Sequence, residues 1–392
     1  MPELRFPEYQ DNGGWDEDKL SELVTTVTPP KKLSTNLYQD AGQYPIIDQS
    51  QSNICGWTND KESLISDNFP LIIFGDHTCI LKMACEPFAQ GADGIKILKA
   101  KDQVEPEFLY QTLQVRPVVM EEYKRHFSIL KERIVGFPEK ESGEQQKIAD
   151  CLTSVDDLIT AQTQKLDALK THKKGLMQQL VPAEGETVPE LRFPEFRDAG
   201  EWEGAKLGEK DIAIFVKERI PLDQLTLESY VSTENLLPDY AGVTTASNLP
   251  STGSFTQYKK GDILVSNIRP YLKKVWAATI EGGTSNDVIV IRAKSKVRNS
   301  FLAYLLRNDE FINYVMKGAK GVKMPRGDIS LIKEYPVAIP TNPKEQQKIT
   351  DCLSSIDELI TAQTHKIAAL KTHKKGLMQQ LFPSVGGVAG EA

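Results

Sequence analysis

A duplicated segment constrains this chain more than any other feature of its sequence. Residues 144–182 recur as residues 345–383, and 31 of the 39 aligned positions are identical. A shorter block at Pro2–Glu8, followed by Trp15, recurs at Pro189–Glu195, followed by Trp202. The segments between these blocks, 16–143 and 203–344, share little visible sequence. The chain therefore places two variable segments in one repeated frame, which consists of the short block and the 39-residue segment in two copies each.

The duplicated segment has the hydrophobic spacing of a paired helix. Steps of four and three residues, sustained over many turns, are typical of a coiled-coil seam. A single amphipathic helix lying on a globular core would show the same spacing, but two near-copies in one chain favour pairing with each other. Gln162 and Gln363 lie on the seam. Its apolar positions are Ile148, Leu152, Val155, Ile159, Leu166 and Leu169, and in the second copy Ile349, Leu353, Ile356, Ile360, Ile367 and Leu370.

The two helices are predicted to pair antiparallel. A helix of this length extends about 57 Å, and only an antiparallel pair brings together the two helix ends that the second variable segment connects. Each helix is acidic near its start, as at Asp156 and Asp357, and basic near its end, as at Lys173 and Lys374. Antiparallel pairing sets acid against base. The Pro2–Trp15 block must then lie near the C-terminal end of the second helix.

The expected fold class is α+β, with two globular α/β domains separated by two long antiparallel coiled-coil helices in a pseudo-twofold, quasi-circular arrangement. We expect domains at residues 1–143 and 183–343, helices at 144–182 and 344–383, and a flexible tail at 384–392. With 26% charged and 40% hydrophobic residues, the composition excludes a mainly disordered chain. The sequence shows neither an apolar run of membrane-spanning length nor a signal-peptide core. Five cysteines without a Cys-x-x-Cys pair favour a reducing, cytoplasmic location.

Motifs for catalysis are not found in the sequence. It shows no phosphate-binding loop, dinucleotide fingerprint or nucleophile elbow. The five histidines lack metal-ligand spacing, and His77 has no partner motif. We therefore expect a protein without cofactor, metal or catalytic residues. An enzyme hidden in the first variable segment would need a nucleophile–base pair that the sequence does not show.

Charge and side-chain chemistry point to the variable segments as binding surfaces. The net charge of −7 argues mildly against a nucleic-acid partner, but basic residues cluster in two loops of the second segment. Asn267 and Arg269 can read adenine and guanine edges bidentately, and neighbouring cations and aromatics suit phosphate contacts. Ordinary solvated surface is the alternative. The candidates are Asn267, Arg269, Tyr271, Lys273, Lys274, Lys320, Lys323 and Arg326, and in the first segment Gln49, Ser50, Gln51, Asp76, His77, Thr78 and Lys82.

Specific motifs connect the chain to a known family. They are the repeated block with Trp202, the Glu-Gln-Gln-Lys-Ile helix openings at Glu144 and Glu345, and two stretches similar to recurrent target-recognition domains, 261–271 and 74–78 with 91–94. On these features the chain resembles the specificity subunit of type I restriction–modification systems over nearly all its length.

The resemblance implies a non-catalytic DNA-binding subunit of a host-defence system. Each of two target-recognition domains would read one half of a split, asymmetric site in double-stranded DNA. The helices would set the gap and dock two adenine-methylating modification subunits, and restriction (motor-nuclease) subunits would join them. S-adenosylmethionine, ATP and magnesium would act on those partners only, and no membrane would be involved. The alternative is a coiled-coil scaffold with two protein-interaction domains and no DNA reading.

Overall fold

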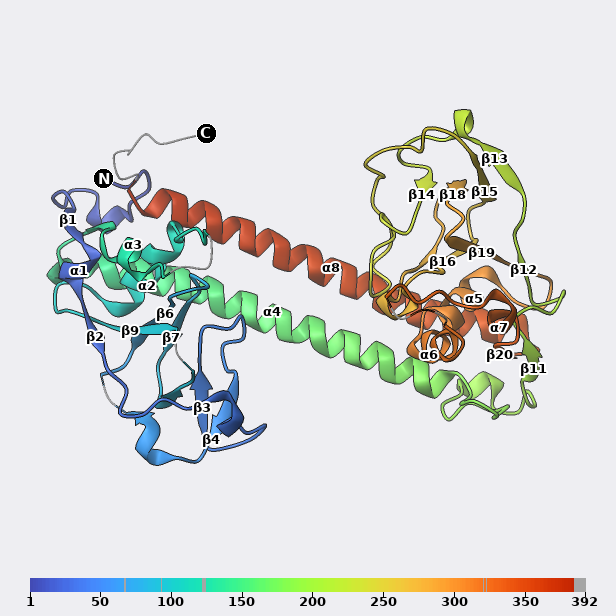
Figure 1. The fold of residues 1–392 in the computed structure, drawn as a ribbon, viewed down its shortest axis with the longest axis horizontal. Helices are drawn as coiled ribbons and strands as arrows, with labels where there is room; N and C mark the ends of the chain where they lie inside the picture. The colour runs from blue at the N-terminus through green and yellow to red at the C-terminus, as the bar shows by residue number, and fades with distance from the viewer. Residues whose placement is uncertain (67, 93, 122–124, 320, 322, 384–392) are drawn as a thin grey trace. The chain divides into compact units, whose positions relative to one another are not determined.

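The structure, a computed structural model, describes residues 1–66, 68–92, 94–121, 125–319, 321 and 323–383. These residues form two compact units (Figure 1). The first unit comprises Met1–Lys165 and the chain from Gln363 on, and the second comprises Leu166–Ala362. Each unit therefore contains part of both long helices, α4 (Glu144–Leu180) and α8 (Pro343–Leu381). The domain boundaries predicted from the sequence lie instead at the helix ends. The tail expected at 384–392 lies outside the described residues.

The described residues of the first unit form three small sheets. One has the order β2-β9-β6-β7 and is antiparallel throughout, one has the order β4-β3-β8-β5 with a parallel pair β3–β8, and the third pairs β1 with β10. The strands are β1 (Asp16–Lys19), β2 (Val24–Val27), β3 (Tyr44–Ile47), β4 (Gly56–Thr58), β5 (Leu64–Ile65), β6 (Leu71–Gly75), β7 (Leu81–Ala84), β8 (Phe88–Gln90), β9 (Ile95–Ala100) and β10 (Ile134–Phe137). The shorter helices are α1 (Leu20–Leu23), α2 (Pro106–Val115) and α3 (Phe127–Lys131), with 3-10 turns η1 (Pro7–Tyr9), η2 (Thr35–Leu37), η3 (Lys61–Ser63) and η4 (Lys140–Ser142).

The second unit repeats two of these three sheets, but its other four-stranded sheet has a different strand order, with the parallel pair β14–β18 in place of β3–β8. Its sheets have the orders β12-β19-β16-β17, β13-β15-β18-β14 and β11-β20. The strands are β11 (Glu203–Lys206), β12 (Ala213–Phe215), β13 (Arg219–Pro221), β14 (Tyr230–Val231), β15 (Ser254–Tyr258), β16 (Ile263–Ser266), β17 (Val275–Ala277), β18 (Gly282–Thr284), β19 (Val288–Ala293) and β20 (Pro336–Ile339). The helices are α5 (Asn299–Leu306), α6 (Asp309–Lys317) and α7 (Ile329–Lys333), with η5 (Pro194–Phe196), η6 (Leu222–Gln224) and η7 (Pro270–Leu272). Helix α6 lacks a counterpart among the described residues between α2 and α3.

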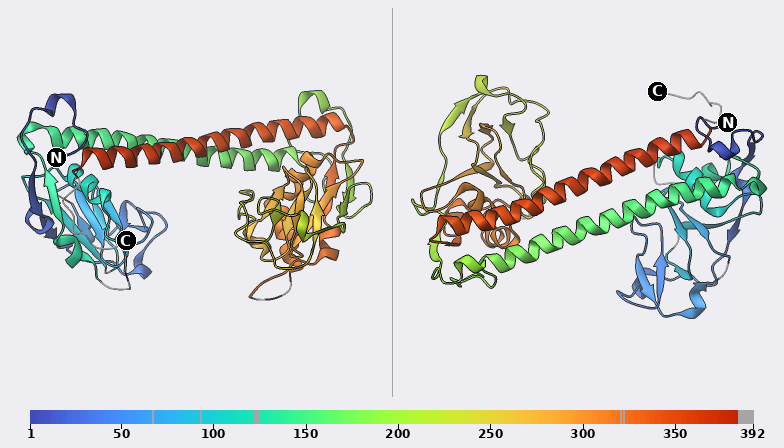
Figure 2. Two further views of the ribbon diagram at one scale, coloured as in Figure 1. Left: turned by 90° about the horizontal axis from the view of Figure 1, so that it is seen from above. Right: turned by 180° about the vertical axis from the view of Figure 1, so that it is seen from behind.

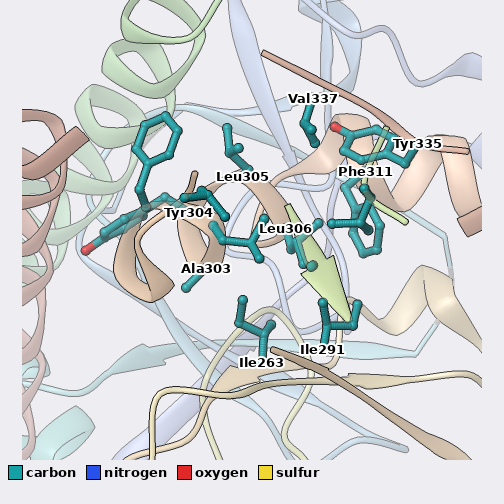
Figure 3. Close-up of a cluster of buried hydrophobic side chains, with 14 of the residues drawn as sticks. Ile263, Ile291, Ala303, Tyr304, Leu305, Leu306, Phe311, Tyr335 and Val337 are labelled. Carbon is teal, nitrogen blue, oxygen red and sulfur yellow. The ribbon is translucent and has the colours of Figure 1, made fainter. Parts of the chain in front are cut away.

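Each unit has its own hydrophobic core, and both long helices contribute to each core. In the second unit, Ile263 and Ile291 of the central sheet pack under α5 and against Phe311 of α6 (Figure 3). Leu180 of α4 and Leu353 of α8 belong to the same buried cluster. The strands of that sheet consist mainly of β-branched and aliphatic residues, which pack well on a pleated, buried surface. The core therefore fixes the sheet against both repeat helices.

Within each unit α4 and α8 run side by side in opposite directions (Figure 2). An ion pair joins the two helices in each unit. In the first unit Lys374 Nζ lies 2.7 Å from Asp156 Oδ2, and in the second unit Lys173 Nζ lies 2.6 Å from Asp357 Oδ1. The predicted antiparallel pairing is confirmed. All predicted seam positions are buried or half-buried. Although α4 and α8 are long, no helix in the described part of the chain is apolar enough to cross a membrane.

The short repeated block holds the two helices together at the same place in each unit. Arg5 makes a bidentate pair with Glu144, with N···O distances of 2.7 and 2.6 Å, and Arg192 does the same with Glu345, at 2.7 and 2.8 Å. Both carboxylates are 1% exposed. The hydrogen bond to the carboxylate raises the pKa of each arginine. These are the strong, planar pairs for which arginine is suited.

The block also contacts the end of the other helix. The Leu4 N–H donates to Gln380 O of α8 over 2.9 Å, and the Leu191 N–H donates to Gln179 O of α4 over 2.8 Å. The first contact confirms that the Pro2–Trp15 block lies at the C-terminal end of the second helix.

The second residue of each Glu-Gln-Gln-Lys-Ile opening ties the helix start to its domain. Gln145 Nε2 donates to Gln103 O and Pro138 O, and its Oε1 accepts from the Glu105 N–H. Gln346 makes the equivalent three bonds, to Lys296 O, Pro340 O and the Arg298 N–H. The motif therefore has a structural role: a buried amide whose hydrogen-bonding groups are satisfied.

Candidate nucleic-acid interface

The two groups of candidate residues occupy the same position in the two units. The loop between β6 and β7 contains Asp76, His77 and Thr78, and the loop between β16 and β17 contains Asn267 and Arg269. The strands on either side have matching pairing partners in the order β9-β6-β7 and β19-β16-β17. We call these the first and second recognition loops, residues 76–79 and 267–273. The two loops share no visible sequence similarity.

The two recognition loops begin with the same backbone contacts. The Asp76 N–H donates to Gly94 O over 2.7 Å, and Asp76 O accepts from the His126 N–H over 2.8 Å. The Asn267 N–H donates to Asp287 O over 2.8 Å, and Asn267 O accepts from the Gly327 N–H over 3.0 Å. Asp76 and Asn267 are therefore structurally equivalent.

Both equivalent side chains point inward. Asp76 is 4% exposed and its Oδ1 accepts from the Phe127 N–H, which begins α3. Asn267 is 7% exposed, and a side chain at Gly327 would place a Cβ 2.8 Å from its Oδ1. Burial of Asn267 favours a role in shaping the loop over the base contact that the sequence suggested.

The second recognition loop has a strained backbone. Arg269 and Lys273, on either side of η7, both have left-handed conformations with φ of 50° and 54°. The neighbouring turn contributes two more, Asp239 at 52° and Tyr240 at 60°. Such conformations cost about 1–3 kcal/mol each and cluster at functional sites. In the first recognition loop Cys79 has a φ of 57°.

The two basic loops of the second segment lie against each other. The Arg269 N–H donates to Pro325 O over 2.8 Å, and Ile268 forms a bridge with Arg326. Arg269, Tyr271, Lys323 and Arg326 are all exposed. The structure thus brings these predicted residues together on one surface. Lys320 lies outside the described residues.

Some of the predicted cations are already engaged within the protein. Lys273 Nζ lies 2.8 Å from Asp309 Oδ1, and Lys274 Nζ donates to Thr233 O over 2.5 Å. Burial, with Arg269 nearby, lowers the pKa of Lys274. Arg326 pairs with Asp287 over 2.7 Å on the surface, and exposed pairs of this kind contribute only about 0–1 kcal/mol. A phosphate could therefore replace Asp287 at little cost.

The first unit presents a more polar and more enclosed arrangement. Thr78 Oγ1 donates to Gln49 O over 2.8 Å, which places residues 49–51 beside the first recognition loop. The side chain of Gln49 packs on Gly94, where a Cβ would come within 2.6 Å of its Nε2. Gln51 is exposed and His77 is half-buried. Ser50 Oγ is buried without a hydrogen-bond partner in the described ranges.

Lys82 faces the protein interior. It is 4% exposed, and its Nζ donates to Asp48 O over 2.7 Å and to Ser52 O over 2.5 Å. Burial lowers the pKa of its ammonium. These contacts assign Lys82 to holding the 48–52 loop in place.

Several residues of the interface had no signal in the sequence. Asp287, just before β19, and Gly327, shortly before α7, support the second recognition loop from positions that are distant along the chain. His126 supports the first in the same way. The residues of these loops that have left-handed backbone conformations are not glycines, so no residue type in the sequence indicates those conformations. No group of three or more His, Cys, Asp or Glu side chains that could hold a metal occurs within the described residues.

Comparison with known proteins agrees with this architecture. The family model for the type I restriction modification DNA specificity domain matches twice, at residues 12–171 and 210–372. The EcoDI specificity subunit of Escherichia coli is 23% identical over 374 residues, which is 85% of this chain and 79% of that protein. The MjaVIII specificity subunit of Methanocaldococcus jannaschii is 27% identical over 49% of this chain and 43% of its own.

Solved structures share the fold. The type I restriction–modification S subunit from M. genitalium aligns with a TM-score of 0.62 and 17% identity over 98% of this chain and 100% of its own. A chain described with the complex assembly and conformational transition of the type I R-M system aligns with a TM-score of 0.53 and 14% identity, over 96% and 99%. The two family matches cover most of the chain, which therefore belongs to the specificity subunits of type I restriction–modification systems, a non-catalytic family whose general role is DNA sequence recognition.

Proposed function

We propose that each unit reads one half of a split, asymmetric site in double-stranded DNA. The observation that carries this proposal is the equivalence of the two recognition loops, which occupy one topological position but carry different side chains. An exposed Arg269 has the geometry to read guanine, whereas the first loop offers Thr78 and the neighbouring Gln49 and Gln51. Two equivalent readers with different chemistry favour a site whose halves differ.

The chain as a whole carries the wrong sign of charge for strong DNA binding by itself. Its net charge is −7, and phosphate neutralisation supplies most of the affinity of DNA-binding proteins. The exposed cations of the second unit suit local phosphate contacts. We propose that the methyltransferase subunits supply the remaining positive surface, so that the specificity subunit contributes discrimination more than affinity.

The repeated helices offer one docking site in each unit for these subunits. Leu158 of α4 is 42% exposed, and Leu359, its copy in α8, is 55% exposed. Neither residue lies on the helix seam, so pairing does not require a leucine there. An exposed leucine at the same position of both copies favours a partner that binds twice. We propose two modification subunits, with restriction subunits joining them, and with S-adenosylmethionine, ATP and magnesium acting on these partners only.

Exchange of the variable segments tests whether each unit reads its half-site independently of the other. Replacing residues 203–343 with the segment of another specificity subunit should change one half of the methylated sequence, which long-read methylation mapping would detect. The reciprocal exchange of residues 16–143 is the matched control and should change the other half. Simultaneous change of both halves in either chimera would contradict independent readers.

The helices are proposed to set the gap between half-sites. Inserting four residues between Thr160 and Ala161 adds about 6 Å of helix, and DNA rises 3.4 Å per base pair. The gap should therefore lengthen by about one or two base pairs with both half-sites unchanged, since a coiled coil absorbs a four-residue stutter by local unwinding. The same insertion at the exposed Gly185 is the control and should leave the gap unaltered. An unchanged gap in an active complex carrying the insertion after Thr160 would show that the helices do not set the gap.

The pure chain is expected to show neither methyl transfer nor nuclease activity. Its family is non-catalytic, and we propose that the chemistry resides in the partner subunits. Incubation of the chain alone with labelled S-adenosylmethionine and duplex DNA tests this, with the reconstituted complex as the positive control. Methyl transfer by the chain alone would overturn the assignment.

A further inference from the structure

Asp309 connects the second recognition loop to a repeat helix. It is the first residue of α6, and its two carboxylate oxygens face two different lysines. Oδ1 lies 2.8 Å from the Nζ of Lys273, which ends the recognition loop, and Oδ2 lies 3.2 Å from the Nζ of Lys174, which belongs to α4. The hydrogen bond from Lys273 holds the pKa of Asp309 below its usual value, so the residue is a carboxylate at neutral pH.

The connection is made where the loop backbone is strained. Lys273 has a φ of 54°, and its carbonyl oxygen accepts from the N–H of Tyr240, which itself has a φ of 60°. Left-handed residues other than glycine persist only when their surroundings hold them. The ion pair to Asp309 is one of the contacts that hold Lys273.

Other groups gather at the same point. Arg307, which caps α5, donates from Nη2 to Tyr240 O over 3.3 Å. Burial and the charge of Asp309 raise the pKa of the Tyr240 hydroxyl. The end of α5, the start of α6, the Tyr240 turn and the end of the recognition loop therefore meet beside α4.

The first unit is built differently at this point. Arg116 caps α2 as Arg307 caps α5, but the residue two positions later is the buried Val118, where the second unit has Asp309. Lys375 is the copy of Lys174 in α8. The carboxylate that would connect this lysine to a recognition loop is absent at that position of the sequence.

We infer that Asp309 is a positioning residue for sequence discrimination by the second unit. It anchors the end of the second recognition loop to α4 and so fixes the direction in which Arg269 and Tyr271 point. This inference rests on the proposed function, because it assumes that the loop reads DNA. Asp309 itself carries a negative charge and is not expected to contact DNA.

The Asp309→Asn variant tests the inference in the assembled methyltransferase complex. The substitution keeps the shape of the side chain but removes the charge that holds both lysines. Affinity for the cognate site should fall about three- to tenfold, since two partly exposed ion pairs are lost. Non-specific affinity should stay equal or rise, because the complex gains net positive charge and two unpaired lysines. Misfolding would instead lower both affinities.

A panel of duplexes with single base changes in either half-site localises the effect. Discrimination should weaken in the second half-site only, so the first half-site serves as an internal control. Asp309→Glu should restore part of the discrimination. Lys174→Gln breaks only the weaker of the two pairs, at an exposed residue, and should give a smaller loss in the same half-site.

Glu203→Gln is the matched control for charge. Glu203 pairs with Lys296 on the surface of the same unit, and its substitution should leave discrimination unchanged. The inference is overturned if Asp309→Asn discriminates second half-site changes within about twofold of Glu203→Gln. A failure of the unsubstituted complex to distinguish its site from other DNA would instead overturn the proposed function.

Discussion

The two units share their frame but differ in their recognition loops. The bidentate Arg–Glu pair, the buried glutamine that ties each long helix to its domain, and the backbone contacts at the start of the loop occur in both units. Four residues separate Gly75 from Ile80 in the first loop, and seven separate Ser266 from Lys274 in the second. The additional length forms η7 and exposes Arg269 and Tyr271. Repeated sequence therefore specifies where a recognition loop is held, and variable sequence specifies what it presents.

The largest effect is expected from the buried pair of the frame. Glu345→Gln removes the charge that satisfies Arg192, which leaves a buried guanidinium without its partner. Loss of one member of such a pair costs about 3–5 kcal/mol in the free energy of unfolding. Chemical denaturation followed by circular dichroism would measure the loss.

Glu144→Gln is the matched variant in the first unit. Glu345 also accepts from the Trp202 indole N–H over 3.2 Å, whereas the equivalent Trp15 N–H has no partner in the described ranges. Glu345→Gln should therefore destabilise the protein more than Glu144→Gln, by about 1 kcal/mol. Equal losses would show that the tryptophan bond contributes nothing.

The next effect concerns base reading by Arg269. Arg269→Ala should weaken binding of the complex to its site by about 1–3 kcal/mol and relax specificity at one base of the second half-site. Arg269→Lys is the control for charge, because lysine keeps the cation but cannot form the bidentate contact. Full discrimination by Arg269→Lys, measured by competition between duplexes, would show that Arg269 contacts phosphate.

The repeated frame of helices and short blocks could be predicted from the sequence because it depends on local patterns that occur twice. The four–three spacing and the acid-to-base gradient were sufficient for the antiparallel pair of helices, and connectivity placed the Pro2–Trp15 block. Helix ends were predicted within two residues, with α4 ending at Leu180 and α8 beginning at Pro343.

The recognition surface was predicted less completely because it depends on contacts between distant residues. Arg269 and Arg326 were both identified, but their proximity follows from the bond between Arg269 and Pro325. Lys82 was selected for its charge, which the fold buries. The partner of Lys273 lies in a helix with no counterpart among the described residues of the first unit, and no spacing in the sequence indicates it.

A smaller effect is expected at the glutamines of the helix seam, which are copies of each other in the repeat. Gln363 Nε2 donates to both Gln162 O and Gln162 Oε1 over 2.9 Å. Gln363→Leu should cost about 1 kcal/mol, because it removes this bond. The double variant, with leucine at both positions, should recover that loss, since two apolar residues suit the seam. A double variant less stable than Gln363→Leu in urea denaturation would contradict this.

The smallest effect is expected at Lys323, the exposed cation beside Arg326. If it contacts a phosphate, Lys323→Ala should weaken cognate and non-cognate duplexes equally and reduce the slope of log affinity against log salt by about one. The change in affinity should be largest at low salt, where the counterion contribution is greatest. Lys317, whose ammonium lies 5.8 Å from the centre of the Tyr314 ring, is a control cation of the same unit. Equal salt slopes for Lys323→Ala and the unsubstituted complex would show that Lys323 does not contact a phosphate.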